Sequence, residues 1–268
     1  MVEFQRKDFY SYEDFLEIMR LLRAPGGCPW DREQTHSSIR RNFLEETYEV
    51  LDAIDHDDAS GMCEELGDVL MQVAFHAQIE AERGRFTMAN VLDGVARKLV
   101  YRHPHVFGDV QADTSQQVLA NWDVLKRREK GQRSTADAVE AVPHTLPALW
   151  RAEKIQSKTA KAGFDWTSSL QALDKLEEEV RELRAALEAG QAADAPHGIR
   201  EELGDTLFMA AKIAQMSGVD PEDALHRACD KFDRRFRAVE EAADKPLPEC
   251  GEAELLALWN DAKSHDPS

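Results

Sequence analysis

The sequence of 268 residues is poor in basic side chains and has no long apolar run. Its 33 lysines and arginines face 51 aspartates and glutamates, which gives a formal net charge of −18. Proteins that bind long nucleic acids or anionic membranes need a basic face, so this balance argues against both partners. The longest apolar runs fall short of the roughly 18 residues that a membrane-spanning helix requires, so we expect none.

Cysteine is also scarce. The four cysteines, Cys28, Cys63, Cys229 and Cys250, form no CxxC pair, and residues 1–10 are polar, unlike a signal peptide. We therefore expect reduced thiols in a cytoplasmic protein, although a thiol nucleophile stays open. A hydrophobic content of 43%, with 11 phenylalanines and 5 tryptophans, is sufficient for a buried core.

The glycine-rich loops that commonly bind phosphate are missing as well. The sequence contains no GxxxxGK[ST], GxGxxG or GxSxG pattern. Any phosphate binding must therefore come from side chains.

The chain contains two copies of one pattern. The sequence EELGD occurs at 64–68 and again at 201–205, and EExxE occurs at 45–49 and again at 178–182. The pairs KxxxR, WxxxK and GxxW also recur in the same order, at offsets of 133 to 137 residues. Chance similarity between two acidic segments does not explain so many ordered matches, so we predict tandem domains.

Apolar spacing of three and four residues predicts helices throughout, and hence an all-α fold. We predict an N-terminal helical bundle over 1–130, a linker over 131–147 and a C-terminal helical bundle over 148–268. Pro104 should end the preceding helix. Leu66 and Leu70 should face a core, and the recurring Gly67 and Gly204 suggest close helix packing beside the acidic residues.

The recurring acids have a spacing that suits a metal site. Carboxylates three residues apart lie on one helix face, and two such helices packed antiparallel would bring four together. Uncompensated carboxylates repel one another, so a hard divalent cation is their natural partner. Without paired histidine or cysteine, the pattern favours Mg²⁺, with Mn²⁺ as a substitute. The first acidic set comprises Glu46, Glu49, Glu65 and Asp68, and the second acidic set comprises Glu179, Glu182, Glu202 and Asp205.

Lysine, arginine and tryptophan recur at matched positions too. Arginine offers a planar fork and lysine a point charge to phosphate oxygens, while tryptophan could pack near a nucleobase. A binding site for a nucleoside triphosphate requires a metal site, cationic side chains and an aromatic ring. The first basic-aromatic set is Lys98, Arg102, Trp122 and Lys126, and the second is Lys231, Arg235, Trp259 and Lys263.

Plainer interpretations exist for each motif taken alone. Glutamate-rich faces are usually just solvated, surface ion pairs contribute under about 1 kcal/mol, and tryptophan is more often a core residue. A non-catalytic module that binds metal-nucleotide or a partner protein is one alternative. A di-iron oxidoreductase is another, but only one ExxH motif, Glu33 to His36, is present where two are needed. His103 and His105 we interpret as part of a helix end.

The ordered motifs resemble the MazG proteins among the all-α nucleotide pyrophosphohydrolases. The resemblance rests on GCPWD at 27–31, LEETYEV at 44–50, EELGD and RHPHVF at 102–107, and spans about Phe15 to Lys263. It implies helical homodimers that hydrolyse nucleoside triphosphates to monophosphate and pyrophosphate with Mg²⁺. It also implies that the acidic sets are metal ligands and that the basic-aromatic sets contact the nucleotide.

One position departs from the family pattern. Members often carry a lysine just before the acidic motif of the second copy, where this chain has Gly198. Two interpretations stay open: either Arg200 substitutes for that lysine, or the second copy lacks one phosphate contact. Two-domain members tend to rely on the C-terminal copy. In the mechanism that this resemblance implies, metal-activated water attacks the α-phosphorus, and an outer glutamate, Glu45 or Glu178, orients or deprotonates that water.

Overall fold

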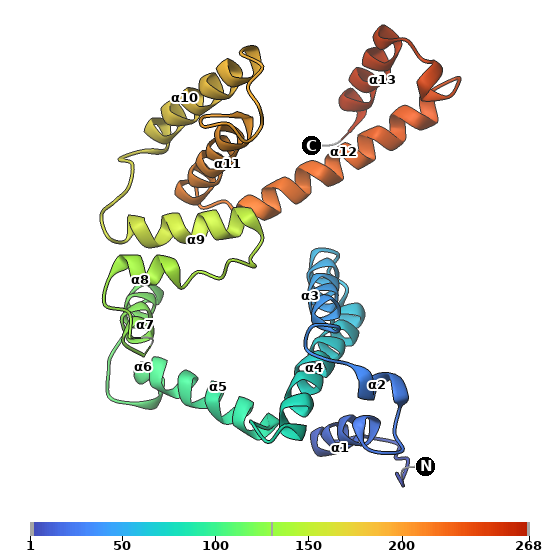
Figure 1. The fold of residues 1–268 in the computed structure, drawn as a ribbon, viewed down its shortest axis with the longest axis vertical. Coiled ribbons are helices and arrows are strands. Elements are labelled where there is room, and N and C mark those ends of the chain that lie inside the picture. Colours follow the sequence, from blue (N-terminus) through green and yellow to red (C-terminus); the bar gives the residue numbers. More distant parts are fainter. Residues whose placement is uncertain (1–2, 130, 267–268) are drawn as a thin grey trace. The chain divides into compact units, whose positions relative to one another are not determined.

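The computed structural model describes residues 3–129 and 131–266, and all regular structure within these ranges is helical. The predicted all-α class is therefore confirmed. The chain divides into two compact units, Met1–Lys126 and Arg127–Ser268 (Figure 1). The division lies near the predicted boundary at residue 130, and the predicted linker contains a short helix. The outer ends of the predicted domains, residues 1–2 and 267–268, and residue 130 lie outside the described ranges.

The described part of the first unit contains seven helices, and the last of them ends three residues past the division at Lys126. They are α1 (Tyr12–Arg23), α2 (Pro29–Glu33), α3 (Arg40–Asp55), α4 (Ala59–Glu82), α5 (Met88–Arg102), α6 (Pro104–Phe107) and α7 (Ser115–Glu129). Helix α5 ends directly before His103 and Pro104, as predicted from the proline.

Helices α3 and α4 form the central pair of this unit. The turn between them is tight, since Asp57 adopts a positive φ of 53° and Asp58 caps α4. The Asp58 carboxylate accepts hydrogen bonds from the backbone N–H groups of Ser60 and Gly61, which would otherwise lack partners in the first turn. This short connection fixes the register in which the carboxylates of the two helices meet.

The core of the first unit lies at the C-terminal half of α4 rather than beside the acidic residues. It contains Met19, Ile39, Ala74, Phe75 and Ile79. The prediction that Leu66 and Leu70 face a core was wrong for the isolated chain, because their side chains are 50% and 40% exposed. Helical periodicity identifies an apolar face, but it does not identify what covers that face.

The second unit repeats the central pair. Its helices are α8 (Thr135–Glu140), α9 (Ala148–Ala160), α10 (Ser169–Glu188), α11 (Ile199–Met216), α12 (Pro221–Ala242) and α13 (Glu252–His265), with a 3₁₀ turn, η1 (Leu247–Glu249). Helix α10 packs on α11, as α3 packs on α4, and α9 packs on α11. Buried Gln156 ties α9 to α11 by donating a hydrogen bond of 2.7 Å to the Phe208 carbonyl.

The two recurring glycines do not serve close helix packing within the chain. A Cβ atom added at Gly67 or Gly204 would meet no atom within 4 Å. The prediction of a tight helix contact at these positions was therefore wrong. Both glycines lie inside long helices, α4 and α11, as predicted.

No described helix combines the length and the apolar character needed to cross a membrane.

Candidate functional site

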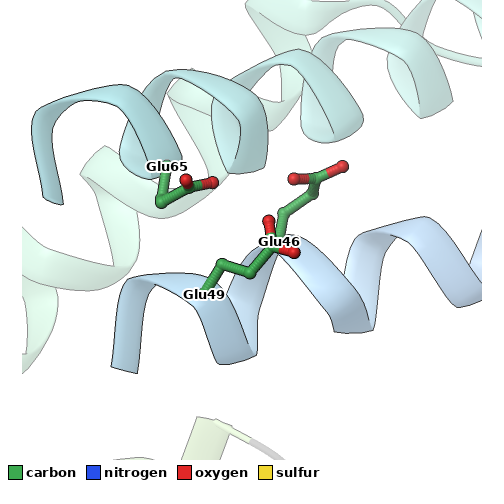
Figure 2. A group of neighbouring side chains, drawn as sticks. All are labelled: Glu46, Glu49 and Glu65. Atoms are coloured by element: carbon green, nitrogen blue, oxygen red, sulfur yellow. The ribbon is translucent and has the colours of Figure 1, made fainter. Parts of the chain in front are cut away.

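The first acidic set converges between α3 and α4. Glu46 and Glu49 project from α3, and Glu65 projects from α4 into the same space (Figure 2). One carboxylate oxygen from each of the three lies within 4.8 Å of the others. Asp68 lies outside this group of three, but close enough to Glu46 to repel its charge. The predicted set is thus brought together, with Asp68 at its edge.

Crowding changes the acidity of this group. Burial, followed by the nearby charges of Asp68 and Glu49, raises the pKa of Glu46. Burial and the neighbouring Glu49 likewise raise the pKa of Glu65. The Oε2 atom of Glu65 is buried and has no hydrogen-bond partner among the described residues. These oxygens therefore lack a compensating positive charge, which fits a cation site of hard oxygen ligands.

The second acidic set is more deeply buried. Glu179 on α10 and Glu202 on α11 are 6% and 4% exposed, and their oxygens lie within 4.8 Å of each other and of Asp205. Burial raises the pKa of Glu202, and the nearby Glu182 adds to the effect. Burial and the Glu179 charge raise the pKa of Asp205. Glu182 lies outside the group of three, as Asp68 does in the first unit.

A lysine that the recurring motifs did not identify lies against the second acidic set. The Nζ atom of Lys175 lies 2.9 Å from an oxygen of Glu178 and 2.8 Å from an oxygen of Glu179. Hydrogen bonds to these two glutamates raise the pKa of Lys175 above its ordinary value. The signal was present in the sequence, because a lysine three and four residues before two glutamates lies on their helix face. The first copy has Asn42 at the matching position.

Arg200 has a different environment from the one expected of a substitute for that lysine. Its guanidinium pairs with Asp194, and both side chains are about three-quarters exposed. Lys175, by contrast, lies directly against Glu179 of the second acidic set.

The two outer glutamates differ in their partners. Glu45 pairs with Arg41 at 2.7 Å on the surface of α3, whereas Glu178 pairs with Lys175. The hydrogen bond from Lys175 lowers the pKa of Glu178, so this carboxylate stays ionised at neutral pH. Both glutamates lie on the helices that carry the metal-site candidates.

Two cations of the first basic-aromatic set lie beside the indole ring of Trp122. The guanidinium of Arg102 lies 5.2 Å from the centre of the Trp122 ring, and the ammonium of Lys126 lies 4.5 Å from it. Arg102 is only 8% exposed at the end of α5. Lys98 lies one turn earlier on the same helix. Arg102 on α5 and Trp122 on α7 therefore lie in contact, and their role in binding a nucleotide stays a prediction.

The second basic-aromatic set lies on α12 and α13, which pack on each other. The Trp259 ring contacts Phe232 at a centroid distance of 5.3 Å, and Arg235 pairs with Asp266 at 2.8 Å. Lys231 and Lys263 are exposed. The acidic set of this unit, by contrast, lies on the α10–α11 pair.

His197 lies beside the second acidic set, with its Nδ1 atom 3.7 Å from an oxygen of Glu202, but neither described group of three carboxylates includes a histidine. His36, the residue of the lone ExxH motif, hydrogen-bonds through its two ring nitrogens to His76 and Glu80 at 2.7 and 2.5 Å. Within the described ranges, the groups able to hold a metal contain carboxylates alone. This donor set suits Mg²⁺ or Mn²⁺ and does not match the histidine-containing di-iron pattern.

Comparison with known proteins finds the same domain at two places in the chain. The family model for the MazG nucleotide pyrophosphohydrolase domain matches residues 34–107 and 167–239, which include both acidic sets. The chain is 46% identical over 226 residues to the nucleoside triphosphate pyrophosphohydrolase of Escherichia coli K12, covering 84% of this chain and 85% of that protein.

Two further relatives extend over nearly the whole chain. The nucleoside triphosphate pyrophosphohydrolase/pyrophosphatase MazG of Thermotoga maritima is 41% identical over 258 residues, or 95% of this chain and 96% of the relative. The uncharacterized protein YabN of Bacillus subtilis is 43% identical over 260 residues, or 95% of this chain and 52% of the relative. With two matched domains and relatives of this similarity, the chain belongs to the MazG family of nucleotide pyrophosphohydrolases.

Proposed function

We propose that the protein hydrolyses ribo- and deoxyribonucleoside triphosphates to monophosphates and pyrophosphate with Mg²⁺, or Mn²⁺ in its place. The observation that carries this proposal is the second acidic set, in which two buried glutamates and Asp205 converge beside Lys175. Family membership and the names of the relatives supply the reaction class.

The residues of both acidic sets fit a magnesium ion. Their ligands are all oxygens. Burial, and after it the charges of neighbouring carboxylates, raises the pKa of Glu46, Glu65, Glu202 and Asp205, and a divalent cation would stabilise their ionised forms. When bound, Mg²⁺ supplies a lowered pKa for a coordinated water and positive charge opposite the triphosphate.

Side chains of the protein would accept the proton and bind the phosphates. Glu178 stays ionised, so it can accept a proton from the water that attacks the α-phosphorus. The Lys175 ammonium lies where it can exchange a glutamate oxygen for a phosphate oxygen. Lys231 and Arg235 would bind the β- and γ-phosphates, and Arg235 would release Asp266 to do so.

We assign turnover to the second copy. Lys175 is matched by Asn42 in the first copy, and Glu45 there pairs with exposed Arg41 instead of a lysine at the acidic group. The test compares Glu46→Gln with Glu179→Gln for Mg²⁺-dependent pyrophosphate release. We expect release to persist in Glu46→Gln and to be lost in Glu179→Gln. Loss in Glu46→Gln alone would assign turnover to the first copy, and nucleotide binding without release in the wild type would favour a non-catalytic module.

We further propose that the protein works as a homodimer. Apolar side chains along α3 and α4 are widely exposed, including Leu44 and Leu66 at 50% each and Tyr48 at 43%. Several large apolar side chains exposed on one helix pair are typical of a subunit interface. Light scattering should give twice the chain mass of 30.3 kDa. The variant Leu66→Lys/Leu70→Lys should be monomeric, and a monomeric wild type would refute the proposal.

A further inference from the structure

A groove in the second unit opens beside the second acidic set. Its volume is about 650 Å³, which lies within the range of small-molecule sites. One wall is the loop 163–166 between α9 and α10, and the other is the face of α10 that carries Gln171 and Asp174. The lining of the groove continues along α10 through Lys175 and Glu178 to Arg181, so the groove includes Lys175, which contacts Glu179 of the second acidic set.

The loop wall is aromatic. Phe164 is 78% exposed, which is unusual for so large an apolar side chain, and it lines the groove together with Trp166. The loop turns at Gly163, whose φ of +86° favours glycine, and the Phe164 N–H donates a hydrogen bond to the Thr159 carbonyl. The exposed ring is thus presented by an anchored backbone.

A buried ion pair fixes the base of this wall. Lys212 on α11 is 1% exposed and pairs with Asp165, and its ammonium lies 5.8 Å from the centre of the Trp166 ring. A second hydrogen bond of 2.7 Å joins Lys212 to Gln215. The position of the Trp166 ring is therefore set by the interior of the unit, which makes the wall preorganised for a flat ligand.

The helical wall offers a donor beside an acceptor. The Oε1 atom of Gln171 accepts hydrogen bonds of 3.0 Å from the N–H and hydroxyl of Thr167. These bonds occupy the Gln171 carbonyl oxygen, so the group that this side chain can offer to a ligand is its NH₂ donor. Asp174 lies one helical turn further along and supplies carboxylate acceptors.

We propose that this groove binds the nucleobase of the triphosphate and sets the base preference of the enzyme. Aromatic rings accept any base by stacking, and an adjacent donor and acceptor distinguish between base edges. A base stacked on Phe164 directs its sugar and α-phosphate toward Lys175 and Glu178. This inference rests on the proposed function, since it places the substrate of the second acidic set.

The first copy does not carry the same amide donor and carboxylate acceptor. Ser38 and Arg41 stand where the second copy has Gln171 and Asp174, and Arg41 is engaged with Glu45. Its entry turn keeps an aromatic residue, Trp30, which is 60% exposed. Trp30→Ala is therefore a matched control for an exposed aromatic residue in the equivalent turn.

The test separates base binding from phosphate binding. Calorimetry with Mg²⁺ would compare α,β-methylene nucleoside triphosphates, which resist cleavage, with inorganic tripolyphosphate, which has no base. Phe164→Ala should weaken binding of the methylene analogues about 10-fold or more, in line with loss of base stacking, and leave tripolyphosphate binding unchanged. Trp30→Ala should change neither. Asp174→Asn should alter the order of affinity among the four bases.

Two results would overturn the proposal. Either the analogues and tripolyphosphate weaken equally in Phe164→Ala, or neither changes while circular dichroism shows a folded protein. Failure of the proposed function is a separate outcome, because it appears as a wild type that releases no pyrophosphate, whatever the binding of the analogues.

Discussion

The buried Lys212–Asp165 pair permits a quantitative test of how the groove wall is supported. Asp165→Asn keeps the shape of the side chain but removes the charge opposite an ammonium that is 1% exposed. Breaking a buried ion pair in this way typically costs 3–5 kcal/mol, and we expect about 3 kcal/mol here. The lower figure follows because Asp165 is 26% exposed and because Gln215 still accepts a hydrogen bond from Lys212.

Urea unfolding at fixed ionic strength measures the effect. With a slope of about 2 kcal/mol per molar urea, the midpoint of the unit-2 transition should fall by about 1.5 M in Asp165→Asn. The double variant Asp165→Asn/Lys212→Met should recover most of this loss, because an apolar side chain replaces the unpaired charge. A change below about 0.5 kcal/mol in Asp165→Asn, or additive losses in the double variant, would refute the reasoning.

Two further predictions concern the acidic sets. Because burial and repulsion raise the pKa of Glu46, its ionisation opposes folding above that pKa, so Glu46→Gln should unfold at a higher temperature than the wild type at pH 8 in EDTA. This advantage should shrink as the pH falls through the raised pKa; calorimetric scans at several pH values measure it, and an advantage independent of pH would contradict the cause. Lys175→Met should lower kcat/KM for triphosphates about 30-fold or more, because it removes a phosphate contact. It should not weaken Mg²⁺ binding, because it also removes a positive charge that repels the metal ion. Steady-state kinetics and metal titration test this pair of effects, and weaker Mg²⁺ binding would speak against it.

The acidic sets could be predicted from the sequence because their geometry is local. Carboxylates three residues apart share a helix face, and the short connection at Asp57 and Asp58 makes α3 and α4 neighbours. The convergence of Glu46, Glu49 and Glu65 follows from these two facts. Helix ends were equally accessible where proline marks them, as at the end of α5.

Features that depend on tertiary packing were not accessible. Helical periodicity alone placed Leu66 and Leu70 on an apolar helix face, but their exposure depends on which residues pack against that face. Lys175 is a different case, because its helix-face spacing to two glutamates is visible in the sequence, but it has no counterpart in the first copy, where Asn42 stands. The Lys212–Asp165 pair joins segments with no shared pattern, so only the folded chain reveals it.

Hydrolysis in H₂¹⁸O tests the central claim most directly. With Mg²⁺ and a nucleoside triphosphate, attack of water at the α-phosphorus places one ¹⁸O atom in the monophosphate and none in the released pyrophosphate. We predict this labelling at equal amounts of the two products, and its loss in Glu179→Gln. Label in pyrophosphate, or release of orthophosphate with nucleoside diphosphate, would contradict the account.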